Sequence, residues 1–390
     1  MMETRKEFLP LFKPVIDDEE IKEVTAILKS GWLTTGPKTR EFEEKFAEYS
    51  DAKHGIGVIN CTTALFMCLE AANMEKGSEV ITTPLTWCSS ATVIENAGMK
   101  TVFADVNKRT GCIDPKEIEK KITKKTRAII PVHFAGQPCD MDPILELAEK
   151  HSLTVVEDAA HAIGASYKNR KIGGISRFTC FSFYANKNLT TGQGGMITVN
   201  DDEDNKILRM MRMYGLKEGA EDRYSEKTIS HYLVEFPGYN FRLFDLLAAV
   251  GLPQLKKFDA LNAKRKKIMD TYNKAFSGME HVEVYDIEDY TTSHGLHLYS
   301  ILADIDNLSI TRDQFINELR SMNVGTGLHY DALHYHPFFK KKYGLKKGDF
   351  PNAEYLSDRT ISLPFFPSMT EDDTLYVINA VEDIIKKFKK

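Results

Sequence analysis

The chain lacks any uninterrupted apolar run long enough to cross a membrane, and it has only two tryptophans among 390 residues. A spanning helix needs about 20 consecutive apolar residues, so we expect no membrane span. Residues 1–13 carry charges scattered among the apolar positions, which is not the pattern of a secretory signal. These absences favour a cytoplasmic protein.

Cysteine is also scarce, and the chain has no excess of positive charge. The six cysteines form no Cys-x-x-Cys pair and no Cys/His cluster at zinc spacing, so we expect reduced thiols and no metal site. The formal net charge of -5 provides no basic footprint for nucleic acid. One dense basic stretch, residues 256–267, has a helical pattern and is explained by a solvated helix face. The composition, 42% hydrophobic and 27% charged with a mean hydropathy of -0.32, is that of a globular protein.

Helical and strand-like patterns alternate between residues 18 and 200. Amphipathic or capped segments predict helices at 18–30, 63–72 and 143–150. Short apolar runs predict buried strands at 57–59, 80–81, 102–103, 128–132 and 154–156. The pattern indicates an α/β fold with a mostly parallel central sheet and helices on both faces, whose strands end at one ligand-binding edge.

The pattern changes after about residue 250. We expect a long charged helix at 254–277, strands at 282–284 and 297–302, and a helix at 315–322. This order is typical of a smaller C-terminal α+β domain. We therefore divide the chain into a large domain at residues 1–255 and a small domain at residues 256–390, with the N-terminal segment packing on the small domain.

Two residues of opposite charge follow apolar strands in the large domain. Asp158 stands where the run Val155-Val156-Glu157 ends, and Lys187 follows the run 181–183 shortly before the glycine-rich segment 192–195. Alone, Asp158 is equally well explained as a helix cap, and an isolated lysine is usually a surface charge. Together they suit pyridoxal phosphate (PLP). A lysine amine binds this cofactor as an imine, and a carboxylate keeps its ring nitrogen protonated.

Three further segments supply what this cofactor would need. Thr62 and Thr63 open a helix directly after a strand, and free backbone N–H groups with hydroxyls at such a position bind anions. Ser182 would add a hydroxyl for the phosphate. The alternative for both threonines is plain helix capping. Trp87 lies in a loop after a strand and suits stacking on a flat ring, although a core position would explain it as well.

Beyond these residues, the chain as a whole closely resembles the DegT/DnrJ/EryC1/StrS family of PLP-dependent sugar aminotransferases. The resemblance extends over almost the whole length, and several collinear matches are far more specific than any one of them. The matching segments are residues 31–37, 131–137, 157–161, 182–187, 238–242 with 248–249, and 325–330.

The resemblance implies a role for each matching residue. Lys187 corresponds to the cofactor-binding lysine, Asp158 to the partner of the ring nitrogen and His161 to the residue that contacts the ring hydroxyl. Ser182, Thr62 and Thr63 correspond to phosphate ligands, and Trp87 to the stacking aromatic. Asn240 corresponds to an asparagine that reaches the phosphate from a neighbouring subunit, which implies a homodimer with shared active sites. The implied fold is that of aspartate aminotransferase.

Within the family, residues 85–87, 325–329 and 361–367 are most similar to enzymes that aminate C4 of nucleotide-linked 4-keto sugars, including the 4-amino-arabinose branch of lipid A modification. This implies that L-glutamate donates an amino group to PLP, leaving 2-oxoglutarate, and that a 4-keto sugar nucleotide, namely a UDP-sugar, receives it. The product would be a 4-amino sugar for a cell-surface polysaccharide or lipid A.

Two other functions stay open at this point. Relatives with histidine in place of the lysine are sugar dehydratases, which Lys187 disfavours, and the same scaffold can serve a non-catalytic regulator that binds PLP or a sugar nucleotide. His329, Tyr330 and His334 are candidates for substrate binding because they lie in a segment dense in polar aromatic rings. A surface or interface loop is the alternative for that segment.

Overall fold

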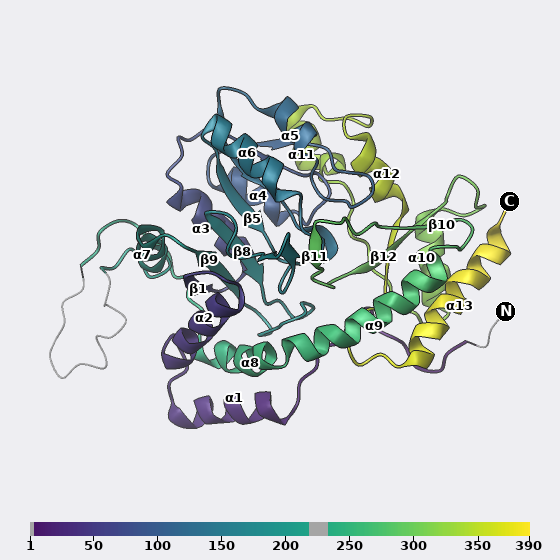
Figure 1. Cartoon of the computed structure of the whole chain (residues 1–390), viewed down its shortest axis with the longest axis horizontal. Helices are drawn as coiled ribbons and strands as arrows, with labels where there is room; N and C mark the ends of the chain where they lie inside the picture. The colour runs from purple at the N-terminus through teal and green to yellow at the C-terminus, as the bar shows by residue number, and fades with distance from the viewer. Residues whose placement is uncertain (1–3, 218–232) are drawn as a thin grey trace.

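A central seven-stranded sheet organises the first half of the chain in the computed structural model, which describes residues 4–217 and 233–390 (Figure 1). The strand order is β1-β9-β8-β5-β4-β2-β3, in which β9 is antiparallel to both of its neighbours and the other pairs are parallel. The strands are β1 (His54–Val58), β2 (Glu79–Thr82), β3 (Lys100–Phe103), β4 (Thr126–Ile130), β5 (Thr154–Asp158), β8 (Phe178–Ser182) and β9 (Gly195–Val199). All five predicted strands and the mostly parallel sheet are confirmed.

Alternate residues of these strands face opposite layers of helices, as the two-residue repeat of a strand requires. On β4, Ile129 packs into the core under α2, α5, α6 and α8, whereas Ala128 and Ile130 pack under α3, α4 and α7. The predicted helical cover on both faces is therefore confirmed. The helices of this part are α1 (Asp18–Ser30), α2 (Pro37–Tyr49), α3 (Cys61–Ala71), α4 (Ser89–Asn96), α5 (Pro115–Lys121), α6 (Met141–His151), α7 (Asp202–Met211) and α8 (Asp245–Lys256).

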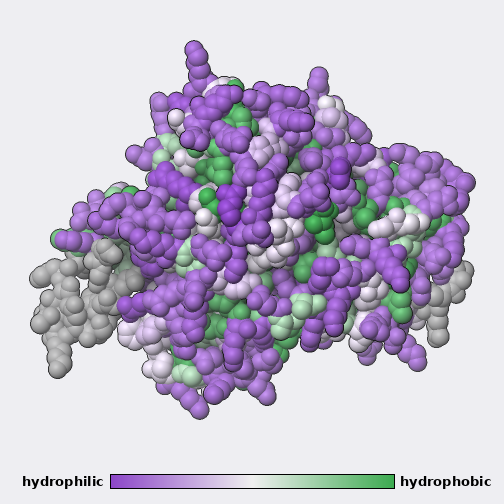
Figure 2. Space-filling model, viewed as in Figure 1, coloured by the Kyte–Doolittle hydropathy of each residue, from purple (hydrophilic) through white to green (hydrophobic). Residues whose placement is uncertain are grey.

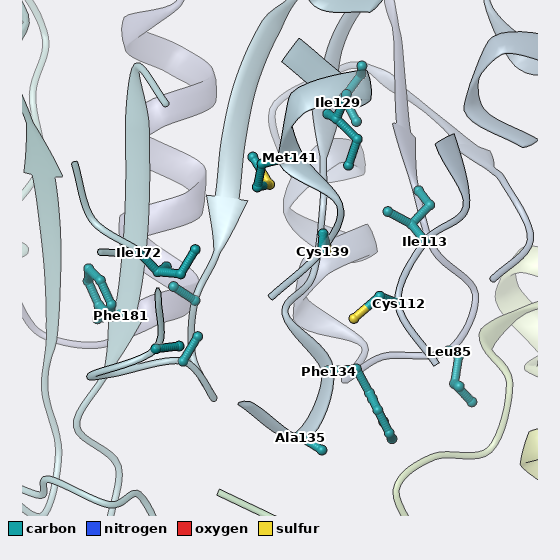
Figure 3. Packing of buried hydrophobic residues seen from close by; sticks show 14 of the residues in the cluster. Leu85, Cys112, Ile113, Ile129, Phe134, Ala135, Cys139, Met141, Ile172 and Phe181 are labelled. Atoms are coloured by element: carbon teal, nitrogen blue, oxygen red, sulfur yellow. The ribbon is translucent and has the colours of Figure 1, made fainter. Parts of the chain in front are cut away.

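The cysteines lie inside these layers. Figure 3 shows Cys112 and Cys139 among the apolar side chains of Ile113, Met141 and Phe134. All six cysteines are free and five of them are buried, as expected for reduced thiols.

A second core lies in the C-terminal half of the chain. Its sheet is antiparallel, with β12 (Tyr299–Ala303) between β10 (Val282–Val284) and β13 (Thr360–Leu363). Helices α9 (Phe258–Phe276), α10 (Arg312–Ser321) and α13 (Glu371–Phe388) pack on it, and this α+β part lies at the right in Figure 1. The remaining elements are α11 (Pro337–Tyr343), α12 (Pro351–Arg359), the 3-10 turns η1 (Phe134–Gly136) and η3 (Leu333–Tyr335), and a small sheet of β11 (Thr291–Ser293), β6 (Ser166–Tyr167) and β7 (Arg170–Lys171).

The N-terminal segment runs beside this second core. Leu9 is buried there, donates its N–H to Asn323 O and accepts from Gly325 N, and Arg5 pairs with Asp373 of α13 at 2.5 Å. The division between residues 255 and 256 stays a prediction. Within the described residues, no helix is both long enough and apolar enough to cross a membrane.

The long charged helix predicted at 254–277 is confirmed as α9 over Phe258–Phe276, but its predicted start is wrong, because α8 ends at Lys256 and α9 begins at Phe258. Lys257 between them leaves helical geometry (φ -99°, ψ 4°), and its ammonium pairs with Asp17 and Glu20 at the start of α1. Phe258 is buried against the ring of Tyr49. These contacts with distant segments break a helix that the local pattern shows as continuous.

Helix α1 begins and ends where its capping residues predict. Asp17 and Glu20 form a capping box at its start, and Gly31 closes it in the left-handed region at φ 74°. Its apolar stripe is only partly covered, however. Ile27 is buried, whereas Ile21 and Leu28 are 58% and 57% exposed.

Candidate active site

A cavity of about 480 Å³ opens at the carboxyl ends of β5 and β8, where a doubly wound sheet binds its ligands. The volume is in the range of small-molecule sites. Eight of the predicted site residues line it together: Thr62, Trp87, Asp158, His161, Ser182, Lys187, His329 and Tyr330. The space-filling view shows a mostly hydrophilic face broken by smaller hydrophobic areas (Figure 2).

Asp158 is the last residue of β5 and is buried. Its Oδ2 accepts a hydrogen bond of 2.7 Å from the Ser90 hydroxyl, and its Oδ1 accepts one of 3.1 Å from the Ala160 N–H. Burial nevertheless raises the pKa of this carboxyl above its usual value, against the opposing effect of these donors and of Lys187. A cation bound beside Asp158 would relieve this penalty, which makes the carboxylate a receptor for positive charge.

Lys187 lies five residues beyond the end of β8, and its Nζ is 3.3 Å from His297 Nε2. Burial lowers the pKa of its amine to about 8, while Asp158 and Cys61 act in the opposite direction. A larger fraction of the amine is therefore neutral at physiological pH than for an ordinary lysine. Only the neutral amine attacks a carbonyl, so the environment activates Lys187 as a nucleophile.

The aromatic side chains of His161, His329 and Tyr330 form part of the cavity lining. The His161 ring lies 4.3 Å from the His297 ring, and its Nδ1 accepts from the Ala135 N–H at 3.3 Å. The neutral His161 ring therefore carries its proton on Nε2, which donates to the Tyr330 hydroxyl at 3.1 Å. Burial lowers the pKa of His161 well below its usual value and that of His329 to about 4. These rings are neutral donors and acceptors near pH 7.

The two threonines at the start of α3 differ in their contacts. Asn60 caps the helix by accepting from the Thr63 N–H at 2.8 Å, and the Thr63 hydroxyl donates to Asn60 O at 2.7 Å. The structure therefore places Thr63 in the capping role and outside the cavity lining. The exposed Thr62 and the buried Ser182 both line the cavity. A Cβ at Gly195 would lie 2.6 Å from the Asn60 carbonyl carbon, so this approach of β9 to the helix start requires glycine.

Trp87 is 61% exposed at the edge of the cavity, and its ring centroid is 6.3 Å from that of Tyr330. Trp87 is therefore not a core residue, which was the other explanation that its sequence position allowed. A flat indole at the mouth of a polar cavity provides a stacking surface for a planar ring.

Besides Thr63, two other predicted residues do not line this cavity. His334 is fully buried, and its Nε2 contacts Glu354 at 3.1 Å, so its environment is that of a structural residue. Asn240 is exposed and its Oδ1 accepts from Arg242 Nε at 3.2 Å. The predicted role of Asn240 requires a second subunit, and it stays a prediction.

Several residues of the site carry no recognisable signal in the sequence. Ser90 on α4 and His297 before β12 contact Asp158 and Lys187 from 68 and 110 residues away. Asn186 lines the cavity, and its buried Oδ1 has no hydrogen-bond partner in the described part of the chain. A buried acceptor without a partner is unfavourable, and a hydrogen-bond donor on a bound molecule would satisfy it.

These residues fit the cofactor that the sequence predicts. The cavity offers an activated amine, a buried carboxylate, hydroxyls at a helix start and a free aromatic face, and its lining residue Asn186 has an unpaired polar atom. The fold and the site thus define a PLP-dependent enzyme with the aspartate-aminotransferase fold.

The chain belongs to the DegT/DnrJ/EryC1/StrS aminotransferase family, whose sequence pattern matches residues 14–382. It is 45% identical over 387 residues to the spore coat polysaccharide biosynthesis protein SpsC of Bacillus subtilis, covering 99% of each chain. It is 28% identical to Helicobacter pylori PseC, an aminotransferase of pseudoaminic acid biosynthesis, with a TM-score of 0.90 over 98% of this chain and 100% of that one. A Streptococcus pneumoniae protein solved in its PLP form is 29% identical, with a TM-score of 0.90 over 97% and 99%.

The predicted fold, cofactor and enzyme class are confirmed by these similarities. The chain is a sugar aminotransferase that uses PLP, takes its amino group from a donor and gives it to a keto sugar. We therefore set aside the two other functions, a sugar dehydratase and a non-catalytic regulator, because the family and the similar proteins are named as aminotransferases.

Proposed function

We propose that this aminotransferase moves the amino group of L-glutamate to C4 of a nucleotide-linked 4-keto sugar, with a UDP-sugar as the preferred acceptor. Residues 325–329 and 361–367 are two of the segments that resemble C4-aminating enzymes. The observation that carries this proposal is that these two segments meet in the structure. Gly327 and Ser362 form a backbone bridge, and His329 Nδ1 lies 2.8 Å from the Ser362 hydroxyl. Both segments thus converge beside the cavity that holds Lys187.

Each residue of the cavity would have its own role in the reaction. Lys187 would bind the cofactor and, once released, carry a proton between substrate carbon and cofactor, for which an amine with a pKa near 8 is suited. Asp158 would hold positive charge at the ring nitrogen, and Thr62 with Ser182 would hold the phosphate. PLP supplies the electron sink that makes a carbon next to the amino group acidic. His329 and Tyr330 would orient the acceptor sugar.

We also propose a homodimer in which Asn240 completes the partner's phosphate site. Exposed large apolar side chains support it, because such side chains gathered on one part of a surface mark interaction sites. They occur along the N-terminal segment and around the cavity mouth: Phe8, Phe12, Ile16, Ile21, Leu28, Trp32, Leu33, Trp87 and Tyr184.

The names of the relatives support a place in surface-sugar synthesis. SpsC is named for the biosynthesis of spore coat polysaccharide, and PseC is described as an aminotransferase of pseudoaminic acid biosynthesis. We propose that the 4-amino sugar made here enters a cell-surface polysaccharide or lipid A, and that the reaction occurs in the cytoplasm.

A two-stage assay tests the proposal. In the first stage, L-glutamate alone should convert the visible absorbance of the bound cofactor to that of its pyridoxamine form, with release of 2-oxoglutarate. In the second stage, 4-keto sugars linked to UDP, dTDP or GDP are each added to the aminated enzyme, and NMR of the product locates the new amine.

The expected result is turnover with a 4-keto UDP-sugar and an amine on C4. Turnover only with a 3-keto sugar, or only with a dTDP- or GDP-linked acceptor, would contradict the position or the nucleotide that we propose. Matched 3-keto and 4-keto acceptors on the same nucleotide separate these two outcomes.

A further inference from the structure

His297 is the neighbour of Lys187 for which the proposed function provides no role. It is buried, does not line the cavity and lies behind Lys187, with Nε2 3.3 Å from the lysine Nζ. Its position excludes direct contact with a substrate in the cavity. Whatever His297 does in the reaction, it does through the amine of Lys187.

The hydrogen bonds behind His297 determine where its ring proton lies. Asn188 Nδ2 is 2.7 Å from Gly295 O and 2.9 Å from Leu296 O, and carbonyl oxygens only accept. The amide nitrogen of Asn188 must therefore face them, which leaves Oδ1 to face His297 Nδ1 at 3.1 Å. Because Oδ1 only accepts, the proton of the neutral ring is on Nδ1. The lone pair of Nε2 then points to Lys187.

The charges around the ring favour this neutral state. Lys187, His161, His329 and Arg265 are the positive or titratable groups that face His297 from the surrounding elements, and they lower its pKa in addition to burial. Arg265 on α9 reaches the same network, because its Nη1 donates to Asn262 Oδ1 at 3.1 Å, and Asn262 Oδ1 lies 3.3 Å from Asn188 Nδ2. A ring surrounded in this way accepts protons poorly but accepts hydrogen bonds well.

We propose that His297 is a positioning residue for Lys187: its Nε2 accepts a hydrogen bond from the lysine amine and holds that amine at the cavity wall whenever the amine is not bonded to the cofactor. Asn188 fixes the tautomer that makes this possible. The inference rests on the proposed role of Lys187 as the cofactor-binding residue. It adds that the lysine amine keeps a fixed position from the time it is released from the cofactor until it attacks the cofactor again.

The hydrogen bond that His297 Nε2 accepts has a measurable consequence in the full-length protein from which cofactor has been removed. A hydrogen bond to the ammonium form of Lys187 stabilises that form, so loss of the acceptor lowers the pH at which the amine loses its proton. The groups that face Lys187 besides His297 are Asp158 and Cys61, together with the neutral rings of His161 and His329. None of these is changed in the variants below.

The test is competitive acetylation of Lys187 with a trace of acetic anhydride from pH 6 to 10, read by peptide mass spectrometry. His297→Leu removes the acceptor and should lower the midpoint for Lys187 by roughly one pH unit, because a hydrogen bond to a charged group is worth about that much. His297→Gln, whose amide reaches the Nε2 position, should keep the midpoint within a few tenths of a unit. His294→Leu, which removes a neighbouring histidine, is the matched control.

An unchanged midpoint in His297→Leu, or an equal fall in His294→Leu, would overturn the proposal. His297→Asn provides a second variant if the leucine variant does not fold, because its amide reaches only the position of Nδ1, and it should lower the midpoint in the same way. The titration needs no cofactor. Failure of the proposed function would be seen separately, as the absence of cofactor on Lys187 after borohydride reduction of the wild-type holoenzyme.

Discussion

Ser90 donates its hydroxyl proton to Oδ2 of Asp158 at 2.7 Å, and the two residues are 68 positions apart in the sequence. Both side chains are buried, and the Thr86 hydroxyl lies 2.9 Å from that of Ser90. This contact links the start of α4 to the end of β5. It fixes the carboxylate that we assign to the ring nitrogen and makes its charged form less unfavourable.

Ser90→Ala should weaken the binding of pyridoxal phosphate. Without the hydroxyl the pKa of Asp158 rises further, so less of the carboxylate is charged when the cofactor arrives. The loss of one hydrogen bond to a charged group predicts a roughly tenfold higher Kd, measurable by fluorescence titration of the protein without cofactor. Thr92→Ala removes another hydroxyl from the same helix outside the cavity and should leave the Kd unchanged. Equal Kd values for wild type and Ser90→Ala would rule out the assigned contact.

Lys187→Met should abolish turnover and the visible absorbance of bound cofactor, and it should stabilise the protein in the cofactor-free state. Burial depresses the pKa of Lys187 from 10.5 to about 8, so at pH 7 the folded state holds an unfavourable charge. Its removal predicts a gain in unfolding free energy on the order of 2 kcal/mol. The destabilisation caused by the buried charge of Lys187 is complete below pH 8 and disappears as the pH rises toward 10.5.

Denaturant unfolding of the cofactor-free proteins at pH 7 and at pH 10 measures this effect. The stabilisation by Lys187→Met should be smaller at pH 10 than at pH 7. Lys116→Met changes an exposed lysine and serves as the control. A Lys187→Met protein less stable than wild type at pH 7 would show that the lysine contributes packing that the charge argument neglects.

The rate at which the cofactor-free protein captures PLP should depend on pH through Lys187. Only the neutral amine reacts, so the second-order rate constant should rise with pH and level off above pH 8, the pKa of this amine. Stopped-flow absorbance records the reaction. A midpoint near 10.5 would mean that the amine is solvated like that of an ordinary lysine.

Local patterns were sufficient for the large sheet and for part of the site. Val155 and Val156 mark a buried strand, and the residue that ends such a strand must lie at the ligand-binding edge, so Asp158 was predictable. Lys187 was predictable for the same reason, from the apolar strand β8 before it. Both arguments use only the neighbours of each residue in the sequence.

The remaining features depend on contacts between distant segments. No local pattern connects Ser90 to Asp158 or His297 to Lys187, because each pair meets only after the helices have packed on the sheet. The break at Lys257 has the same origin, since the residues that pair with this lysine precede it by more than 230 positions. A periodic pattern reports which face of a helix is apolar, and it does not say what covers that face.

Helix α1 provides the test of the homodimer. Its Ile21 and Leu28 lie one above the other on a face that this chain leaves open, and burial of such side chains against a second subunit contributes roughly 2 kcal/mol each. Ile21→Glu combined with Leu28→Glu would place two charges in the interface. We expect the variant to elute as a monomer with light scattering and to lose most of its turnover, because Asn240 would no longer reach the partner's site.

Leu375→Glu is the matched control, since Leu375 is 50% exposed on α13 of the second core. It should leave both the mass in solution and the turnover unchanged. Mixing the α1 double variant with an excess of Lys187→Met protein adds a sharper criterion. If Asn240 acts across the interface and one unaltered α1 face is enough for association, mixed dimers form and the Lys187 of the double variant regains turnover. A monomeric double variant with full activity would instead show that each chain completes its own site.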